Sequence, residues 1–406
     1  NPLWEDFSTI VVASTLKSYS RMSFDYPYHK AISVHAKGQG MEYPMICWNY
    51  GRPDAEGNYS ERVKYGMMSV IIHEVGHNYF PMIVNSDERQ WTWMDEGLNS
   101  FVQYVAEQDF AKKYPTALSP EDKTFPSRRG PAKNIIPYMG GDQDFISPIM
   151  SKGLNVHQFG ENAYGKPATA LNILRETVMG RESFDHAFKT YAQRWMFKHP
   201  TPEDFFRTME DASAIDLDWF WRGWFYTTDV VDIGVKNVKR FYFSDTPDLE
   251  AQERLESYGM DLDNLPKMVF KIDEDSESFD PNLAANTAIE GSQILKEYLQ
   301  KENLDPKATT PKYFYEVEFE KPGGLVMPLI VEYSYADGSK EMVTYPVQLW
   351  RKNDASVKKI IASDKELVGV TVDPNLETAD VNTDNNSWPK QETPSDFDKF
   401  KEKIKG

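Results

Sequence analysis

The chain has 406 residues, 40% of them hydrophobic, and a formal net charge of −18 at pH 7. This length exceeds what one compact core usually takes, so we expect two or three domains. The excess of acidic residues argues against nucleic acid or an anionic membrane surface as a partner. A single cysteine, Cys47, rules out an intrachain disulfide, and no apolar run reaches membrane-spanning length.

The first part of the chain predicts a helix followed by short strands. Residues 4–22 have helical spacing of apolar side chains without Pro or Gly, and residues 31–35 alternate like a strand. Residues 38–48 are typical of an edge strand, because Pro44 cannot donate to a ladder, and such an edge can hold an extended peptide. Glu42 lies in its middle. From the residues alone, Glu42 is either an exposed strand carboxylate or a partner for the ammonium group of a bound peptide.

The stretch from Ser69 to Asn78 contains the pattern His-Glu-x-x-His. On a helix, His73 and His77 project from one face about a turn apart, so two neutral imidazoles can bind one zinc ion. Glu74 lies beside them, where it can take a proton from a water molecule at the metal. The alternative interpretation is a core helix with two hydrogen-bonded histidines.

A second stretch, residues 91–101, supplies a third candidate ligand. Glu96 follows His77 after eighteen intervening residues, which leaves room for a loop and a second helix that returns its carboxylate to the metal. Two histidines and one glutamate leave the fourth zinc position open, as catalytic sites do. Asp95 suits the start of that helix. Candidates for orienting the ligands follow on the same helical face: Asn99, Ser100 and Gln103.

The next region is expected to complete a cleft. A helix over 101–114 leads into the Pro- and Gly-rich stretch 115–148, which should be mostly loop and frame the cleft. Within it, Arg128 and Arg129 form either a solvated pair or a contact for a substrate carboxylate. Tyr164 directly precedes a predicted helix that ends at Gly180, so its phenol can point into the cleft. That helix spans 166–179, and further predicted helices span 184–195, 202–212 and the aromatic-rich core segment 218–226.

From residue 235 the pattern changes toward strands. Residues 245–311 are acidic and mixed, with a helical stretch near 288–300. Period-two alternation then predicts an antiparallel sandwich with a hairpin turn at 336–339; its strands span 313–320, 325–335, 341–350, 357–361 and 367–372. The expected organisation is therefore α+β, with a catalytic domain at 1–232, a connecting region at 233–311, a β-sandwich domain at 312–385 and a polar tail at 386–406.

Four motifs, in this order and spacing, resemble the aminopeptidase N and leukotriene hydrolase family of gluzincin metallopeptidases. They are Gly40-Met-Glu-Tyr, His73-Glu-Val-Gly-His, Glu96 and Ala163-Tyr-Gly-Lys. The resemblance, nearest to a branch with Gly-Met-Glu-Tyr-Pro, implies a thermolysin-like, mainly helical catalytic domain followed by a small antiparallel β-sandwich. From the resemblance we expect this chain to lack the family's N-terminal β domain. Two departures are Tyr43 in place of an Asn, and Gln103 where relatives often have a carboxylate.

The resemblance also implies a role for each matching residue. One Zn²⁺ per chain would be bound by His73, His77 and Glu96. Glu74 would be the general base, Tyr164 the donor to the oxyanion, and Glu42 the anchor for the free amine of the substrate. The backbone that holds the substrate main chain would be that of Gln39, Gly40 and Met41.

The predicted function is a zinc-dependent aminopeptidase that acts on peptides with a free N-terminus. Three alternatives stay open: a zinc endopeptidase of the same clan, a second activity such as epoxide hydrolysis, and a non-catalytic peptide-binding protein. The preferred first residue and the oligomeric state do not follow from the sequence. The resemblance and the abrupt start at Asn1 favour a periplasmic or secreted bacterial protein.

Overall fold

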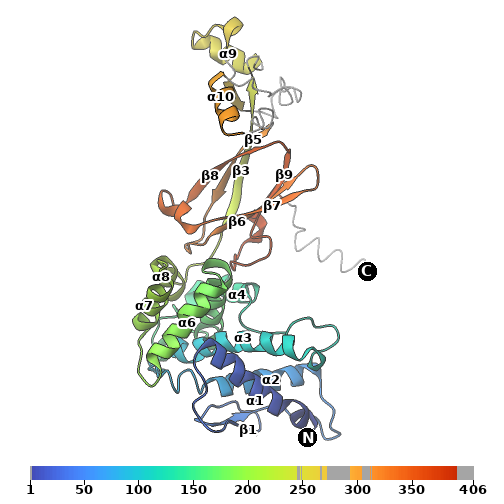
Figure 1. Ribbon diagram of the computed structural model, residues 1–406, viewed down its shortest axis with the longest axis vertical. Coiled ribbons are helices and arrows are strands. Elements are labelled where there is room, and N and C mark those ends of the chain that lie inside the picture. The colour runs from blue at the N-terminus through green and yellow to red at the C-terminus, as the bar shows by residue number, and fades with distance from the viewer. Residues whose placement is uncertain are drawn as a thin grey trace. The chain divides into compact units, whose positions relative to one another are not determined.

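The computed structural model describes residues 2–244, 247, 249–265, 268–271, 293–303, 311 and 313–390. The chain divides into two compact units. Unit 1 comprises Asn1–Val231, Gly324–Val326 and Leu376–Val381, and unit 2 comprises Asp232–Gly323, Met327–Asn375 and Asn382–Gly406. Unit 1 is mainly helical and unit 2 mainly of β-strands (Figure 1), so the predicted α+β class is confirmed.

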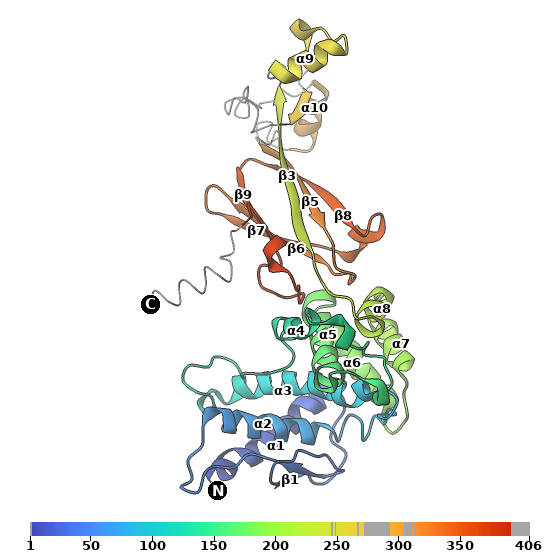
Figure 2. The ribbon, with the colours of Figure 1, turned by 180° about the vertical axis from the view of Figure 1, so that it is seen from behind.

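Three helices of unit 1 pack on one another: α1 (Pro2–Met22), α2 (Glu61–Gly76) and α3 (Leu98–Lys113). Both ribbon views show them side by side (Figures 1 and 2). Gly76 permits this close approach, because a Cβ there would collide with Tyr19 of α1 and with Asn99 of α3. The N-terminus of α2 is capped by Ser60, whose Oγ accepts from the Val63 N–H at 3.3 Å.

The other helices of unit 1 follow in chain order: α4 (Ala132–Met139), α5 (Lys166–Ile173), α6 (Arg181–Trp195), α7 (Pro202–Ser213) and α8 (Asp218–Tyr226). The predicted helix over 166–179 continues beyond α5 as a π-helical segment, Leu174–Val178, before Gly180 at a φ of 78°. The stretch 115–148 is not only loop, since it contains α4. The core packing predicted for 218–226 is confirmed by the burial of Phe220, Trp221, Trp224 and Phe225.

The edge strand predicted over 38–48 is wrong. The strand is only β2 (Ile46–Asn49), which pairs in parallel with β1 (Ile32–His35). Upstream, Met41 forms an antiparallel bridge with Trp48, and the Ile46 N–H donates to the Tyr43 carbonyl at 3.3 Å. The chain therefore turns back on itself around Pro44, whose fixed φ suits a turn as well as an edge.

The described residues of unit 2 form two four-stranded antiparallel sheets with the orders β10-β9-β6-β7 and β4-β3-β5-β8. The strands of the first are β6 (Leu329–Tyr335), β7 (Lys340–Tyr345), β9 (Leu367–Val372) and β10 (Ser387–Trp388). Those of the second are β3 (Gly234–Ser244), β4 (Met268–Lys271), β5 (Tyr313–Glu320) and β8 (Ser356–Ser363).

The predicted hairpin between β6 and β7 is confirmed, with the Tyr335 N–H donating to the Ser339 carbonyl at 2.9 Å. Its two strands are shorter than predicted, because Pro328 precedes β6 and Pro346 follows β7. Two further helices are α9 (Leu249–Ser257) and α10 (Gln293–Lys301). The rest of the predicted helical stretch, 288–292, and residues 391–406 of the predicted tail lie outside the described residues. The predicted division into a connecting region and a sandwich domain stays a prediction.

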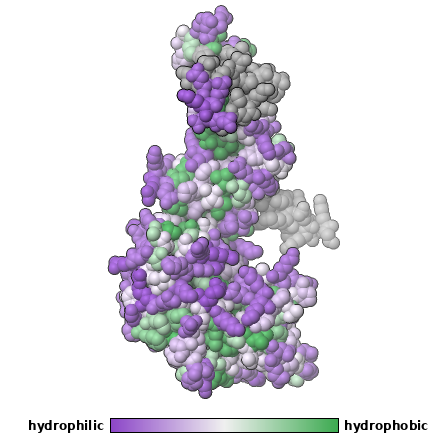
Figure 3. Space-filling view, in the orientation of Figure 1, coloured by the Kyte–Doolittle hydropathy of each residue, from purple (hydrophilic) through white to green (hydrophobic). Residues whose placement is uncertain are grey.

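On the face drawn in Figure 3, hydrophilic residues predominate and hydrophobic ones form separate patches. Among the helices that the structure describes, none is long and apolar enough to cross a membrane.

Candidate active site

Glu96 and Tyr164 each lie on a wide π-helical turn directly before a helix. The first turn, Trp93–Gly97, leads into α3, and the second, Gly160–Gly165, leads into α5. Turns of this kind are rare and occur frequently at functional sites. Gly97 lets the two turns meet, because a Cβ there would lie 2.6 Å from Pro167 Cγ and 3.0 Å from the Ala163 carbonyl oxygen. The two candidate residues are thereby held close together.

The structure brings His73, His77 and Glu96 together as predicted by their spacing. Their candidate donor atoms form a small triangle. His73 Nε2 lies 3.0 Å from His77 Nε2 and 3.0 Å from Glu96 Oε2, and His77 Nε2 lies 3.3 Å from Glu96 Oε2. Tetrahedral bonds of 2.0–2.1 Å to zinc place ligand atoms about 3.3 Å apart. Two imidazoles and one carboxylate at these separations fit a catalytic zinc ion, and a water molecule or substrate can take the fourth position.

The far ring nitrogen of each histidine is engaged, which leaves Nε2 for a metal. His73 Nδ1 lies 2.9 Å from Gln103 Oε1, and His77 Nδ1 lies 2.9 Å from the Phe80 carbonyl oxygen and 3.1 Å from an oxygen of Asp95. A proton on Nδ1 serves each of these acceptors, so the lone pair is on Nε2. Of the three residues that the sequence offered for orienting the ligands, Gln103 contacts the ring of His73, and Asp95 is a buried neighbour of His77.

The electrostatic field at this cluster favours a cation. Burial alone would lower the pKa of His77, but Asp95 and Glu96 outweigh it and raise the pKa well above its ordinary value. Burial raises the pKa of Asp95 to about 6 against the opposing effect of His77. For Glu96, burial is outweighed by hydrogen bonds with both histidines, which hold its pKa well below the usual range. A metal ion bound between these groups would meet the same negative potential.

Glu74 lies next to the three donor atoms without being one of them. Its side chain is buried, and Oε2 has no hydrogen-bond partner among the described residues. Burial raises its pKa to about 7, although His73 and His77 oppose the shift. The Gly40 backbone lies against it, since a Cβ on Gly40 would be 2.5 Å from Glu74 Oε1. A buried, unpartnered carboxylate with this pKa is suited to exchange a proton near neutral pH.

Tyr164 lies beside the candidate ligands on the other side of the site. Its ring stacks on His73 with a centroid separation of 5.8 Å and an interplanar angle of 23°. Burial, together with the nearby charge of Glu96 and a hydrogen bond to it, raises the pKa of Tyr164 above its ordinary value. The phenol therefore keeps its proton at neutral pH and can donate it in a hydrogen bond.

Glu42 lies near the cluster, while the predicted backbone cradle is only partly available. The carboxylate of Glu42 is half-buried, and its oxygen lies within 4.8 Å of donor atoms of His77 and Asp95. The Met41 N–H and carbonyl are bonded to Trp48 at 3.1 Å and 2.8 Å. Of the predicted stretch, the backbone groups of Gln39 and Gly40 are therefore left for a substrate main chain.

Sequence reasoning missed a buried carboxylate, Glu107, behind the candidate ligands. Its Oε1 accepts from Ser69 Oγ at 2.7 Å and from Gln103 Nε2 at 2.9 Å, and its Oε2 accepts from Ser127 Oγ. Burial raises its pKa, and these hydrogen bonds oppose the shift. The signal was present, because an acidic residue one helical turn after Gln103 falls on the buried face of α3. Glu107 fixes the Gln103 amide so that its oxygen faces His73.

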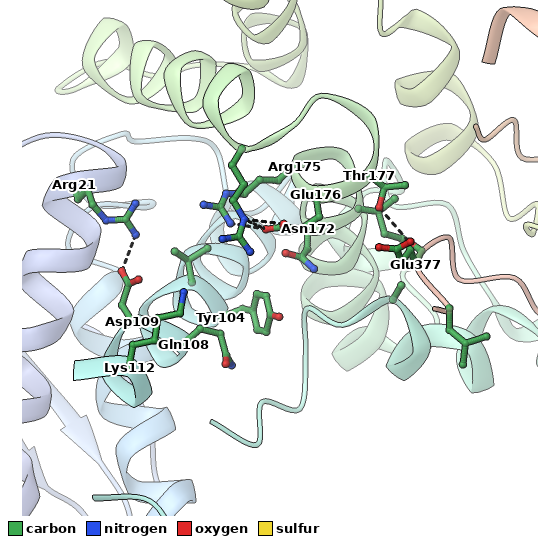
Figure 4. A pocket seen from close by; sticks show the side chains of 15 residues that line it. Arg21, Tyr104, Gln108, Asp109, Lys112, Asn172, Arg175, Glu176, Thr177 and Glu377 are labelled. Atoms are coloured by element: carbon green, nitrogen blue, oxygen red, sulfur yellow. Dashed lines mark hydrogen bonds and ion pairs between the residues drawn. The ribbon is translucent and has the colours of Figure 1, made fainter. Parts of the chain in front are cut away.

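The cavity at this site has a volume of about 290 Å³ and is lined by residues from α2, α3 and the loops around them, including His73, Glu74, Gln103, Arg129 and Tyr164. A larger hollow of about 410 Å³ on the other side of α3 has a different character. Figure 4 shows that its arginines face acidic groups: Arg21 pairs with Asp109 at 2.6 Å, and Arg175 with Glu176 at 2.7 Å. Because these charges neutralise one another, we place the chemistry in the smaller cavity.

The site is typical of metallopeptidases, because a helical unit brings two histidines and a glutamate together beside an unpartnered carboxylate. Residues 15–224, just over half of the chain, match the family model described as "Peptidase family M1 domain". The chain belongs to peptidase family M1. This confirms the resemblance that the four motifs indicate.

Curated relatives are similar over part of their length. Human glutamyl aminopeptidase is 24% identical over 247 residues, which cover 55% of this chain and 24% of that protein. Mouse endoplasmic reticulum aminopeptidase 1 is 23% identical over 155 residues, 38% of this chain and 16% of that protein. The chain thus spans about a quarter or less of the length of these relatives.

One solved structure supports the fold. A Legionella pneumophila aminopeptidase A, determined in complex with aspartic acid, is similar with a TM-score of 0.54 and 12% identity, covering 92% of this chain and 34% of that one. At this identity the similarity shows the fold alone.

Proposed function

We propose that the chain is a zinc-dependent aminopeptidase that hydrolyses the first peptide bond of substrates with a free N-terminus. The observation that carries the proposal is the triangle of His73, His77 and Glu96 donor atoms with the unpartnered Glu74 carboxylate beside it. Membership in a peptidase family supports the reaction class. The aminopeptidase activity of the relatives is stated in their names and supports the choice of exopeptidase.

The chain's own residues supply the remaining chemistry. When bound, zinc lowers the pKa of a coordinated water to about 7 and polarises the substrate carbonyl. Glu74 accepts a proton from the attacking water and passes it to the nitrogen of the leaving amine. The Tyr164 hydroxyl donates to the carbonyl oxygen as negative charge develops there. Removing one such donor typically costs on the order of 10² to 10³ in rate.

Glu42 accounts for cleavage at the first bond. Its half-buried carboxylate near His77 and Asp95 gives the site an anionic end, which pairs with the α-ammonium of a peptide. An internal peptide segment carries no cation at this place and leaves the carboxylate without a partner. The site therefore favours exopeptidase over endopeptidase action.

Three measurements test the proposal. Zinc-loaded Glu74→Gln protein should retain its metal and lose turnover of an aminoacyl-arylamide by a factor of 10² or more; rapid hydrolysis by that variant would show that Glu74 is not the base.

Glu42→Ala should lower the ratio of free-amine to N-acetylated substrate turnover, and an unchanged ratio would contradict the anchor role. Cleavage of N-blocked peptides by the wild-type protein would favour the endopeptidase, and zinc binding without any turnover would favour a peptide-binding protein.

A further inference from the structure

A half-buried arginine in the candidate active-site cavity has no acidic group at ion-pair distance among the described residues. Arg129 lines the cavity with His73, Glu74 and Tyr164. Within the described part of the chain its guanidinium makes neither a hydrogen bond nor an ion pair, and its Nε is buried without a partner. Its neighbour Arg128 differs, because that side chain is 82% exposed and lies 3.6 Å from Glu161. Of the two alternatives for these arginines, the solvated one therefore describes Arg128 better than Arg129.

Arg129 is held in place by the residues on either side of it. The preceding Ser127 donates to Glu107 and accepts from Gln108 Nε2 at 2.9 Å. The following Gly130 has a φ of 106°, packs against the Tyr104 ring where a Cβ would collide, and accepts from Asn172 Nδ2 at 3.0 Å. The guanidinium carbon lies 4.3 Å from the centroid of the Tyr164 ring. A partly buried guanidinium in a fixed position is suited to bind a carboxylate with two parallel hydrogen bonds.

Glu42 and Arg129 have different neighbours in the candidate site. Glu42 lies near His77 and Asp95. The cavity with Arg129 is lined by His73 and Tyr164 and by neither Glu42 nor His77. If Glu42 holds the substrate's amine and Tyr164 faces the scissile carbonyl, the leaving portion enters the cavity beside Arg129. A residue spans at most about 3.3–3.6 Å, so the carboxylate of a dipeptide or tripeptide falls within this small cavity.

We propose that Arg129 binds the C-terminal carboxylate of short peptide substrates, so that the enzyme prefers dipeptides and tripeptides with a free C-terminus. This inference rests on the proposed aminopeptidase function. Anionic Glu42 and cationic Arg129 together complement the two ends of a zwitterionic peptide. An Arg–carboxylate contact contributes to specificity, because the C-terminal amide of the same peptide leaves the partly buried guanidinium without its charged partner.

The test compares the dipeptide Leu-Gly with Leu-Gly-amide, and with leucine p-nitroanilide, which has no carboxylate. We expect wild-type kcat/KM to favour Leu-Gly over its amide, and Arg129→Met to reduce that ratio tenfold or more, chiefly through KM. Arg129→Lys should restore part of the ratio. Arg128→Gln removes the other arginine that lines the cavity, and should change the ratio much less than Arg129→Met, because the Arg128 side chain is exposed and lies near Glu161. Circular dichroism and zinc content verify that each variant is folded and loaded.

Two outcomes would overturn the inference. An unchanged ratio in Arg129→Met means that the carboxylate is bound elsewhere or not at all. An equal loss of kcat on all three substrates means that Arg129 only positions Tyr164. Isothermal titration calorimetry measures the contact without turnover. It compares the dissociation constants of Leu-Gly and its amide for zinc-loaded Glu74→Gln protein with and without Arg129→Met. A wild-type protein that binds Leu-Gly through Arg129 but hydrolyses none of the substrates contradicts the proposed function and leaves the contact standing.

Discussion

Replacing Gly97 by Ala tests whether the contact between the two π-helical turns sets the geometry of the site. The backbone at Gly97 is helical, with a φ of −74° and a ψ of −45°, so alanine is intrinsically favoured there by about 1 kcal/mol. Its Cβ, however, would lie 2.6 Å from Pro167 Cγ, whereas carbon atoms prefer about 3.5–4.0 Å. The turns must then separate by about 1 Å, which moves Tyr164 away from Glu96. Misplacement of that size can reduce kcat by about 10²-fold.

Gly66→Ala is the control for this variant. Gly66 also lies within a helix, α2, but a Cβ there meets nothing within 4 Å. Both variants share the gain in helix propensity, so the difference between their unfolding free energies measures the overpacking cost alone. We expect Gly97→Ala to be less stable than Gly66→Ala by about 1–3 kcal/mol. Urea denaturation measures the stabilities, and arylamide turnover measures kcat. If Gly97→Ala is as stable and as active as Gly66→Ala, the turns do not constrain the site.

The remaining predictions concern the other supports of the site. Gly40→Ala should lower kcat/KM by tenfold or more while zinc content stays unchanged, since its Cβ would displace Glu74; steady-state kinetics and metal analysis check this. Glu107→Leu should leave the Ser69, Gln103 and Ser127 donors unsatisfied, destabilise the fold by about 3 kcal/mol or more, and weaken zinc binding about 10–100-fold, as measured by denaturation and chelator competition. Burial lowers the pKa of Lys166 from 10.5 to about 8. The unfolded chain therefore binds more protons between these pH values, and stability should rise with pH across this window by a few kcal/mol relative to Lys166→Met.

The candidate ligands were predictable because the relevant spacing is local. His73 and His77 still project from one face as their interval of four predicts, although α2 ends at Gly76 and His77 is its C-cap residue. The reason is that the backbone at His77 is still helical. Glu96 and Tyr164 were also identified, but not the π-helical turns that present them. Such turns depend on packing between segments far apart in sequence, as the contact of Gly97 with Pro167 shows.

Tertiary contacts also explain the two interpretations that the structure changes. The strand predicted over 38–48 fails because Met41 and Trp48 bond to each other, and no local pattern shows a bridge across a proline turn. The sequence left Arg128 and Arg129 open between a solvated pair and a contact for a substrate carboxylate. The two side chains differ in the structure, where Gly130, next to Arg129, lies against the ring of Tyr104 in α3, a residue distant in sequence. Roles that depend on a residue's own type and spacing are accessible from sequence, whereas roles that depend on its surroundings are not.

Glu107 connects these observations. A buried carboxylate without a described ion-pair partner is costly, and hydrogen bonds from three donors reduce that cost. Those donors belong to three separate parts of the site. Ser69 is on the helix of the two histidines, Gln103 contacts His73 directly, and Ser127 begins the segment that carries Arg129. Because one side chain accepts from all three, the amide that contacts His73 and the segment with the guanidinium that we propose to bind substrate share a single support. A shift of α3 would therefore disturb metal binding and substrate selection together.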